Sequence, residues 1–383
     1  MHNFTCQLAS GCIMENTKLT QAKIAKIDEF YTRWEVIERE VQAYIEYDAN
    51  VFRGKTILCP CDDPEWSNFT KFFALHFKEY GLKKLISTSY APDSKKYKGG
   101  YQTTLFEKND PKYDVKKTQI HGKIFILESE DVNKDGKINI DDLKWDYMKG
   151  DGDFRSKEVM KLRDESDIIV TNPPFSLFRE FLMWIMEGKK QFLIIGNMNA
   201  ITYKEVFPLI KDNKMWLGPS ITSGDRMFNV PDNFDLYASS FGSDEEGKKY
   251  IRVKGVRWFT NLDHGRRHQS LPLMTIADNL KYSKHKEIKG KKAYEKYDNY
   301  DAIEVPFTDA IPSDYDGIMG VPISFLDKYS SEQFEILGAT ESEGRGFSNG
   351  LWDEESKVSQ PMIANKRIYK RIFIRKKGES NEN

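Results

Sequence analysis

Short apolar runs alternate with longer amphipathic stretches along the chain up to residue 261. A continuous apolar run predicts a buried strand of a parallel sheet, because such a strand is covered on both faces, and a three- to four-residue spacing predicts a helix. The predicted strands are residues 56–62, 83–90, 168–170, 191–197, 215–217 and 250–261. The predicted helices are residues 20–44, 70–80, 156–165 and 203–212, with one more starting at Ser176 as its cap. This alternation predicts an α/β fold with a doubly wound, mostly parallel sheet.

The strand at 168–170 runs into Asn172-Pro173-Pro174-Phe175. The two prolines lack N–H donors and hold φ at about −65°, so the strand ends there in a rigid turn. Open α/β sheets bind ligands at the carboxyl ends of their strands. An amide that both donates and accepts, beside a flat ring, suits a planar base or amide whose NH2 must be held and made nucleophilic.

Two acidic turns precede this one. Residues 62–69 join a strand to a helix, and an open helix N-terminus of this kind can hold a nucleoside-bearing cofactor, although Ser67, Asn68 and Phe69 stand where a glycine-rich loop would have glycines. Residues 150–154 either grip an amino group and stack on a ring or form a solvated turn. Residues 28–32 either pack in the core or bend over a ligand.

A polar insertion at about 91–142 interrupts the pattern, with strands expected at 101–108 and 118–127. Residues 131–142 resemble a calcium loop, with oxygen ligands at the first, third and fifth positions and glycine at the sixth. Asp142 at the last position is shorter than the usual Glu, and no helix is expected before Asp131. We therefore interpret this segment as a turn-rich connection and expect no metal.

The composition is that of a packed globular protein, with 383 residues of which 39% are hydrophobic and 13% aromatic. No apolar run is long enough to span a membrane and no secretion leader precedes the first helix, so we expect no membrane contact. The cysteines are too few to staple the chain and do not form a paired zinc pattern, which indicates a reducing cytoplasm. They are Cys6, Cys12, Cys59 and Cys61.

The net charge of −1 hides an uneven distribution. Residues 248–296 contain fourteen Lys or Arg and four Asp or Glu, and residues 366–377 are basic with no acid. A basic face of this kind suits nucleic-acid phosphates. The chain therefore divides into a loose segment at 1–19, an α/β domain at 20–261 and a basic, aromatic region at 262–383.

In combination these motifs resemble the EcoRI-type family of adenine-specific DNA methyltransferases. The resemblance covers roughly residues 25–340 and is carried by residues 28–32, 171–179, 255–263, 297–303 and 314–328. Asn-Pro-Pro-Phe alone is less specific, because guanine-N2 methyltransferases of RNA and glutamine methyltransferases of proteins share it. The resemblance implies a class I, Rossmann-like domain at 20–261 that binds S-adenosyl-L-methionine, and a mixed target-recognition region at 262–383.

The resemblance also implies roles for single residues. Asn172, Pro173, Pro174 and Phe175 are the catalytic turn: the Asn172 side-chain oxygen and the Pro173 carbonyl accept the two N–H bonds of adenine N6, while Phe175 stacks on the base. The expected cofactor-binding residues are Tyr31, Thr32, Cys61, Asp62, Asp63, Ser67, Asn68, Phe69, Asp153 and Phe154.

Candidates on the substrate side follow from the same resemblance. Trp258 or Phe259 is expected to form the opposite wall of the base pocket, with an ordinary buried aromatic as the alternative. Arg266 and Arg267 are candidates for reading guanine edges, with a solvated basic loop as the alternative.

The expected function is sequence-specific methylation of adenine N6 in double-stranded DNA, with the base flipped out of the helix. We expect a monomer without an obligate protein partner, in a type II restriction–modification system or as an orphan of one. The same chemistry on RNA or on a protein glutamine is an alternative that the basic C-terminal region disfavours. A second alternative is a DNA-binding module whose methyltransferase site is inactive, and the intact 172–175 turn disfavours it.

Overall fold

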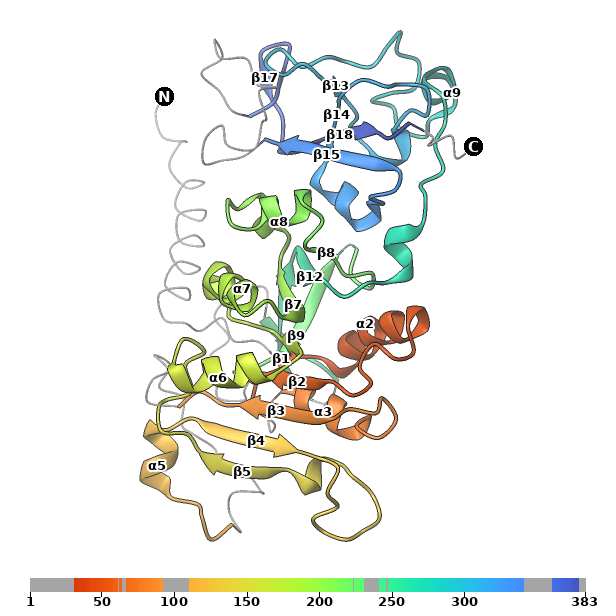
Figure 1. Cartoon of the computed structure of the whole chain (residues 1–383). Coiled ribbons are helices and arrows are strands. Elements are labelled where there is room, and N and C mark those ends of the chain that lie inside the picture. Colours follow the sequence, from red (N-terminus) through yellow and green to blue (C-terminus); the bar gives the residue numbers. More distant parts are fainter. Residues whose placement is uncertain are drawn as a thin grey trace, which may run out of the picture. The chain divides into compact units, whose positions relative to one another are not determined.

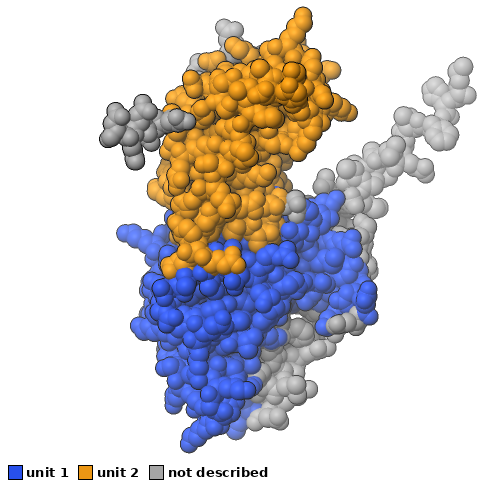
Figure 2. Space-filling model, turned by 90° about the vertical axis from the view of Figure 1, so that its right-hand side faces the viewer, with its two compact units in different colours: residues 1–45, 49–197, 223–258 blue, residues 46–48, 198–222, 259–383 orange. Residues whose placement is uncertain are grey.

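The computed structural model describes residues 31–60, 62–63, 67–91, 110–222, 224–230, 241–245, 247–340 and 360–378. The chain forms two compact units, coloured separately in Figure 2. Unit 1 comprises residues 1–45, 49–197 and 223–258, and unit 2 comprises residues 46–48, 198–222 and 259–383. The expected loose segment at 1–19 and the expected strand at 101–108 lie outside the described residues.

A mixed eight-stranded sheet has the order β5-β4-β3-β2-β6-β7-β12-β8 (Figure 1). Its strands β3, β2, β6 and β7 are parallel neighbours, while β4 and β5 continue it on the β3 side in antiparallel pairs. The division between the units falls within β12, which pairs antiparallel with β8. The strands are β2 (Thr56–Cys59), β3 (Lys84–Thr88), β4 (Lys123–Leu127), β5 (Lys144–Tyr147), β6 (Ile168–Thr171), β7 (Gln191–Asn197), β8 (Trp216–Leu217) and β12 (Val256–Thr260). The predicted α/β architecture is confirmed at this level.

Helices connect the parallel strands because their amphipathic faces cover the sheet. Figure 1 shows α2 and α3 on one side of it and α6 and α7 on the other. Ser67 and Ser156 cap α3 and α6 by accepting the N–H groups of Phe69 and Val159. The helices are α2 (Trp34–Tyr47), α3 (Asn68–Leu75), α5 (Val115–Ile120), α6 (Lys157–Glu165), α7 (Phe178–Glu187), α8 (Phe207–Lys211) and α9 (Ile276–Tyr282). Short 3₁₀ turns are η2 (Ile140–Asp142), η3 (Phe175–Leu177), η4 (Met198–Thr202), η5 (Gly265–His268), η6 (Thr308–Ala310) and η7 (Ile323–Lys328).

A second sheet in unit 1 has the order β1-β9-β11-β10 and joins segments that are distant in sequence. It places Thr32 opposite Phe228 in the antiparallel β1–β9 pair. The predicted helix from residue 20 is therefore wrong at Tyr31 and Thr32, which pair as a strand before α2 begins. The strands are β1 (Tyr31–Thr32), β9 (Asp225–Asn229), β10 (Phe241–Ser243) and β11 (Lys249–Lys254).

Three further predictions about elements are corrected. The strand expected at 250–261 is two strands in different sheets, because the chain turns at Gly255, whose φ is +69°. The strand expected from Thr118 begins at Lys123, because Thr118 lies in the helix α5, which Asp114 caps at its N-terminus. Ser176 does not cap α7, because it lies inside η3, which continues directly into that helix.

Unit 2 contains a four-stranded sheet of order β13-β14-β18-β15 and a separate two-stranded hairpin of β16 and β17. Its core includes a cluster of Tyr297, Tyr300, Ala302 and Phe373. The strands are β13 (Ile303–Glu304), β14 (Met319–Pro322), β15 (Phe334–Ala339), β16 (Met362–Ile363), β17 (Lys366–Arg367) and β18 (Arg371–Lys376). Over the described part of both units, no helix is long and apolar enough to cross a membrane.

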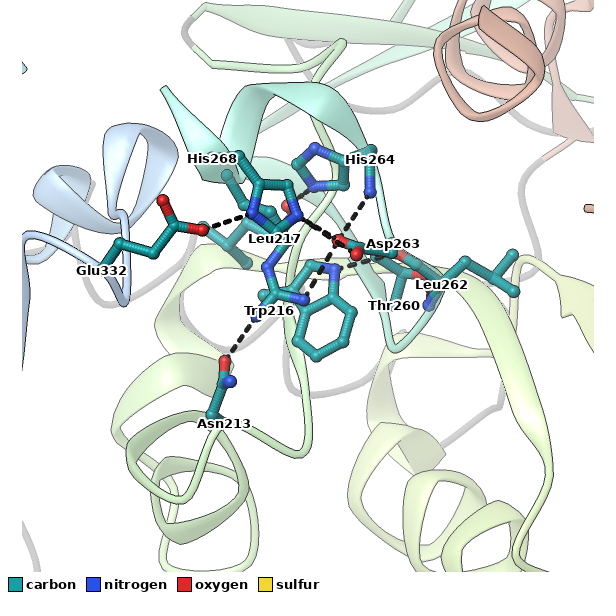
Figure 3. Close-up of polar contacts among 10 residues, drawn as sticks. Asn213, Trp216, Leu217, Thr260, Leu262, Asp263, His264, His268 and Glu332 are labelled. Carbon is teal, nitrogen blue, oxygen red and sulfur yellow. Dashed lines mark hydrogen bonds and ion pairs between the residues drawn. The ribbon is translucent and has the colours of Figure 1, made fainter. Parts of the chain in front are cut away.

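The segment after β12 is tied to β8 by two side-chain hydrogen bonds, one of them from the buried His264 (Figure 3). The indole N–H of Trp216 donates to the carbonyl of Leu262 at 2.9 Å, and Nε2 of His264 donates to the carbonyl of Leu217 at 3.1 Å. Burial lowers the pKa of His264 to about 4. His264 is therefore neutral in the folded protein at ordinary pH.

This burial predicts acid sensitivity. Between about pH 6.5 and 4 the unfolded chain binds a proton at His264 and the folded chain does not, so this group's contribution to stability falls as the pH falls through that window. The full effect is on the order of 3 kcal/mol. His264→Gln keeps an N–H donor without titrating, so its urea midpoint should change less with pH than that of the wild type. An identical pH dependence in the two proteins would contradict this account.

Candidate active site

The turns after β2, β3 and β6 lie at one edge of the sheet, because these strands are parallel neighbours. The Thr171 hydroxyl donates to the carbonyl of Pro60 at 3.0 Å, which joins the ends of β6 and β2. The N–H of Asp62 donates to the carbonyl of Thr88 at 2.7 Å, which joins the ends of β2 and β3. The Asn-Pro-Pro-Phe turn and the first acidic turn therefore meet at one place.

The turn after β6, residues 172–175, is held by burial and by packing of its aromatic ring. Pro173 and Pro174 are buried, Asn172 and Phe175 are partly buried, and the Oδ1 atom of Asn172 is buried. The ring of Phe175 meets that of Phe228 edge-on, with centroids 6.4 Å apart and planes at 86°. Phe228 was missed in the sequence, because the single buried residue of β9 gives too little alternation to predict a strand.

The first acidic turn is organised around Asp62. Its carboxylate is buried and accepts hydrogen bonds from the N–H and the hydroxyl of Thr70, at 3.2 and 2.7 Å. Burial raises the pKa of Asp62 to about 7, although hydrogen bonds from Ser67 and Thr70 act in the opposite direction. Asp62 and Ser67 thus satisfy the N–H groups that begin α3, and Asp63, which is partly buried, follows in the same turn.

Asn68 connects this turn to β1. Its side-chain NH2 donates to the carbonyl of Thr32 at 2.8 Å, which brings the expected cofactor residues Tyr31 and Thr32 to the start of α3. The hydroxyl oxygen of Thr32 is buried and has no hydrogen-bond partner among the described residues. A buried polar atom of this kind is costly unless a ligand satisfies it. Cys61, also expected here, lies outside the part of the chain that the structure describes.

The second acidic turn passes tightly over the end of β3. The N–H of Ala91 donates to the carbonyl of Asp151 at 2.7 Å, and Gly152 has a φ of +84°. A Cβ atom at Gly152 would lie 2.1 Å from the carbonyl oxygen of Ser89. The turn is therefore part of the packed edge and not a solvated loop.

The two residues predicted from this turn differ in their surroundings. Asp153 forms an ion pair with Arg155 at 2.6 Å and is partly buried. Phe154 is buried against Phe181 and Trp184 of α7, with ring centroids 5.1 and 5.7 Å away. Asp153 thus lies at the sheet edge, while Phe154 packs against the helix that follows the Asn-Pro-Pro-Phe turn.

The aromatic candidates of β12 are both fully buried. Trp258 meets Phe69 edge-on at 6.0 Å, and its Nε1 atom has no hydrogen-bond partner within the described ranges. Phe259 pairs with Leu217 of β8. Phe228 lies edge-on to Phe175, whereas Trp258 lies against the cofactor candidate Phe69.

Arg266 and Arg267 both have partners inside unit 2. The guanidinium of Arg267 lies 3.5 Å above the centroid of the Trp216 ring and donates to Asn213 and Asp263 at 2.6 and 3.2 Å. Arg266 donates to the carbonyl of Pro219 at 2.8 Å. Figure 3 shows Asp263 and its neighbours in this cluster. These contacts anchor the segment that carries both arginines.

The loop resembling a calcium site uses its acids internally. The carboxylate of Asp131 accepts the N–H groups of Asp135 and Gly136, and that of Asp142 accepts those of Val132, Asn133 and Asn139. Among the residues that the structure describes, no group of three or more His, Cys, Asp or Glu is arranged to hold a metal.

An α/β sheet whose edge joins acidic turns to Asn-Pro-Pro-Phe is typical of methyltransferases that act on amino nitrogens. The chain belongs to the family described as adenine-specific methyltransferase EcoRI, whose sequence profile matches residues 18–377. The predicted family and enzyme class are thereby confirmed, and the family implies a methyl donor of the S-adenosylmethionine type. No solved structure matches the chain at a comparable level of significance.

Three relatives are similar over most of their length. The chain is 41% identical over 361 residues to type II methyltransferase M.EcoRI of Escherichia coli, covering 93% of this chain and 98% of that protein. It is 34% identical over 319 residues to M.MpnI of Mycoplasma pneumoniae, covering 83% and 84%. It is 33% identical over 362 residues to M.MgeORF184P of Mycoplasma genitalium, covering 93% and 98%.

The close approach at Gly152 can be tested by comparing its alanine variant with that of the nearby Gly150. Gly152→Ala combines a left-handed backbone with a clash against Ser89, so it should lower the free energy of unfolding by about 1–3 kcal/mol. Gly150→Ala meets no atom within 4 Å and should change it by less than about 0.5 kcal/mol. Urea unfolding compares the two, and equal effects would contradict the tight packing of this turn.

Proposed function

We propose that the protein is a sequence-specific DNA methyltransferase that transfers a methyl group from S-adenosyl-L-methionine to N6 of an adenine flipped out of double-stranded DNA. The observation that carries this proposal is the Asn172–Phe175 turn at the carboxyl edge of a parallel strand, in a chain of the adenine-specific family. Relatives named type II methyltransferases support a place in a restriction–modification system or as an orphan of one.

The residues at the sheet edge fit such a cofactor. The buried Thr32 hydroxyl has no partner among the described residues, and the acids at the strand ends suit an amino group and ribose hydroxyls. When bound, S-adenosyl-L-methionine supplies an electrophilic methyl group on its sulfonium. The proposed cofactor residues are Tyr31, Thr32, Cys61, Asp62, Asp63, Ser67, Asn68, Phe69, Asp153 and Phe154. Within this set Asp62 and Ser67 hold the start of α3, and Phe154 supports α7.

Asn172 and Pro173 act on the amino group in this proposal. Adenine N6 is a poor nucleophile because its lone pair is delocalised into the ring. The Asn172 side-chain oxygen and the Pro173 carbonyl accept hydrogen bonds from its two N–H groups. These hydrogen bonds favour a pyramidal nitrogen and stabilise the positive charge that develops there. Pro174 fixes the turn because its ring restricts φ, and the φ angle of Pro174 is −52°.

Aromatic rings hold the base. Phe175 stacks on the flipped adenine, and Phe228 supports Phe175 from the side. Trp258 and Phe259 are buried, and Arg266 and Arg267 bind other residues of the protein. We therefore propose that these four residues support the substrate-binding part of the protein by packing beneath it and do not contact the base directly. Flipping the base costs about a few kcal/mol, which contacts with DNA must offset.

The wider architecture extends the proposal. We infer a doubly wound class I sheet, which the parallel order β3-β2-β6-β7 supports. Residues 262–383 are proposed as the target-recognition region, and the basic residues of 248–296 and 366–377 as contacts to DNA phosphates. The proposed enzyme acts as a monomer.

Asn172→Ala tests the proposed chemistry. Removing an acceptor that acts in the transition state should lower the rate of tritiated methyl transfer into duplex DNA by about 10²–10³-fold. Binding of S-adenosyl-L-methionine, measured by calorimetry, should change little because Asn172 lies outside the proposed cofactor set.

A matched control is Asn50→Ala, which removes an asparagine side chain from a loop of unit 1 and should leave the rate unchanged. Wild-type transfer only to RNA or to protein glutamine would contradict the DNA substrate. Full activity of Asn172→Ala would contradict the assigned role.

A further inference from the structure

The hairpin of β16 and β17 is an unusual feature of unit 2. Met362 pairs with Arg367 and Ile363 with Lys366, so Ala364 and Asn365 form a two-residue turn. Their φ angles are +47° and +60°. Positive φ at both central residues is the signature of a type I′ turn, but alanine in this conformation costs about 1 kcal/mol. The surrounding structure must therefore hold the turn in place.

Asp298 and Asn299 hold this hairpin. The two carboxylate oxygens of Asp298 accept the N–H groups of Ala364 and Asn365, at 3.2 and 2.8 Å. The Asn299 side chain accepts the N–H of Met362 at 3.0 Å and donates to the carbonyl of Gln360 at 2.9 Å. These residues belong to the 297–303 motif, which has no part in the proposed chemistry.

Apolar packing fixes the hairpin from beneath. Ile363 and Ile368 pack against the cluster formed by Tyr297, Tyr300, Ala302 and Phe373. Because side chains alternate along a strand, Ile363 on the inner face puts Met362 and its cross-strand partner Arg367 on the outer face. The hairpin thus has one anchored face and one face turned away from the core.

The far end of the hairpin is polar and exposed. Asn365, Lys366 and Arg367 are all exposed. Their side chains have no hydrogen bond or ion pair with any described residue. Arg266 and Arg267 differ in this respect, because their guanidinium groups already bind within unit 2. Residues 366–377 contain no acid that would compete for these side chains.

We propose that this hairpin enters the major groove of the substrate DNA and reads base edges with Asn365 and Arg367. The proposal rests on the proposed function, since it takes duplex DNA as the substrate. The major groove is wide enough to admit a two-stranded β-ribbon. In it, Arg can form two hydrogen bonds with the edge of a guanine, and Asn can form two with the edge of an adenine. Because Asp298 already holds the turn, the backbone that carries these side chains loses little conformational entropy on binding.

The test maps methylated adenines by long-read sequencing of DNA from a host without adenine methylation of its own. The wild type defines the target. Arg367→Ala and Asn365→Ala should each methylate sites that are degenerate at one position, and kcat/KM on the original site should fall about 10- to 100-fold. The salt dependence of DNA binding should stay nearly as steep as in the wild type.

A control accompanies these variants. Lys161→Ala removes an exposed lysine of α6, outside the hairpin, and should retain the target. An unchanged target with a shallower salt dependence in Arg367→Ala would overturn the proposal, because it indicates a phosphate contact. No adenine methylation by the wild type would overturn the proposed function itself, and the hairpin proposal with it.

Discussion

Parallel pairing of β2 with β3 and β6 is the constraint on which the site depends. It brings three strand ends to one edge, where hydrogen bonds from Thr171 to Pro60 and from Asp62 to Thr88 join the turns. The two prolines after Asn172 then stop β6 at that edge. The first acidic turn and the Asn-Pro-Pro-Phe turn are distant in sequence and become neighbours because of this pairing.

Around this edge, most polar side chains are held by the protein itself. Asp62 and Ser67 satisfy the first N–H groups of α3, and Asn68 ties β1 to the same turn. The hairpin of β16 and β17 in unit 2 is arranged in the same way, because Asp298 holds its backbone while the side chains of Asn365 and Arg367 stay exposed. A rigid backbone positions the groups proposed to meet substrate in both places.

The sequence predicted the elements that have strong local signals. The buried strands β2, β6 and β7 appear where apolar runs predicted them, and helix α6 appears close to its predicted range of 156–165. The small sheet of β1 and β9 was not predicted, because two-residue and five-residue strands gain their stability from partners distant in sequence. Phe228, the partner of Phe175, was missed for this reason.

Tertiary packing adds contacts that residue type alone does not show. Trp258 or Phe259 was expected to form a wall of the base pocket, with an ordinary buried aromatic as the alternative, and the structure buries Trp258 against Phe69. Arg267 was a candidate for reading guanine edges, with a solvated basic loop as the alternative, and in the structure its guanidinium lies over the ring of Trp216. Such pairings depend on the tertiary fold, so residue type and spacing could not predict them.

The most direct measurement identifies the methylated atom. Duplex DNA that has reacted with the enzyme and an isotope-labelled S-adenosyl-L-methionine is digested to nucleosides, which are resolved by mass spectrometry. The account predicts that the label is in N6-methyl-2′-deoxyadenosine. Label in N4-methyl-2′-deoxycytidine instead, or no label in DNA, would contradict it.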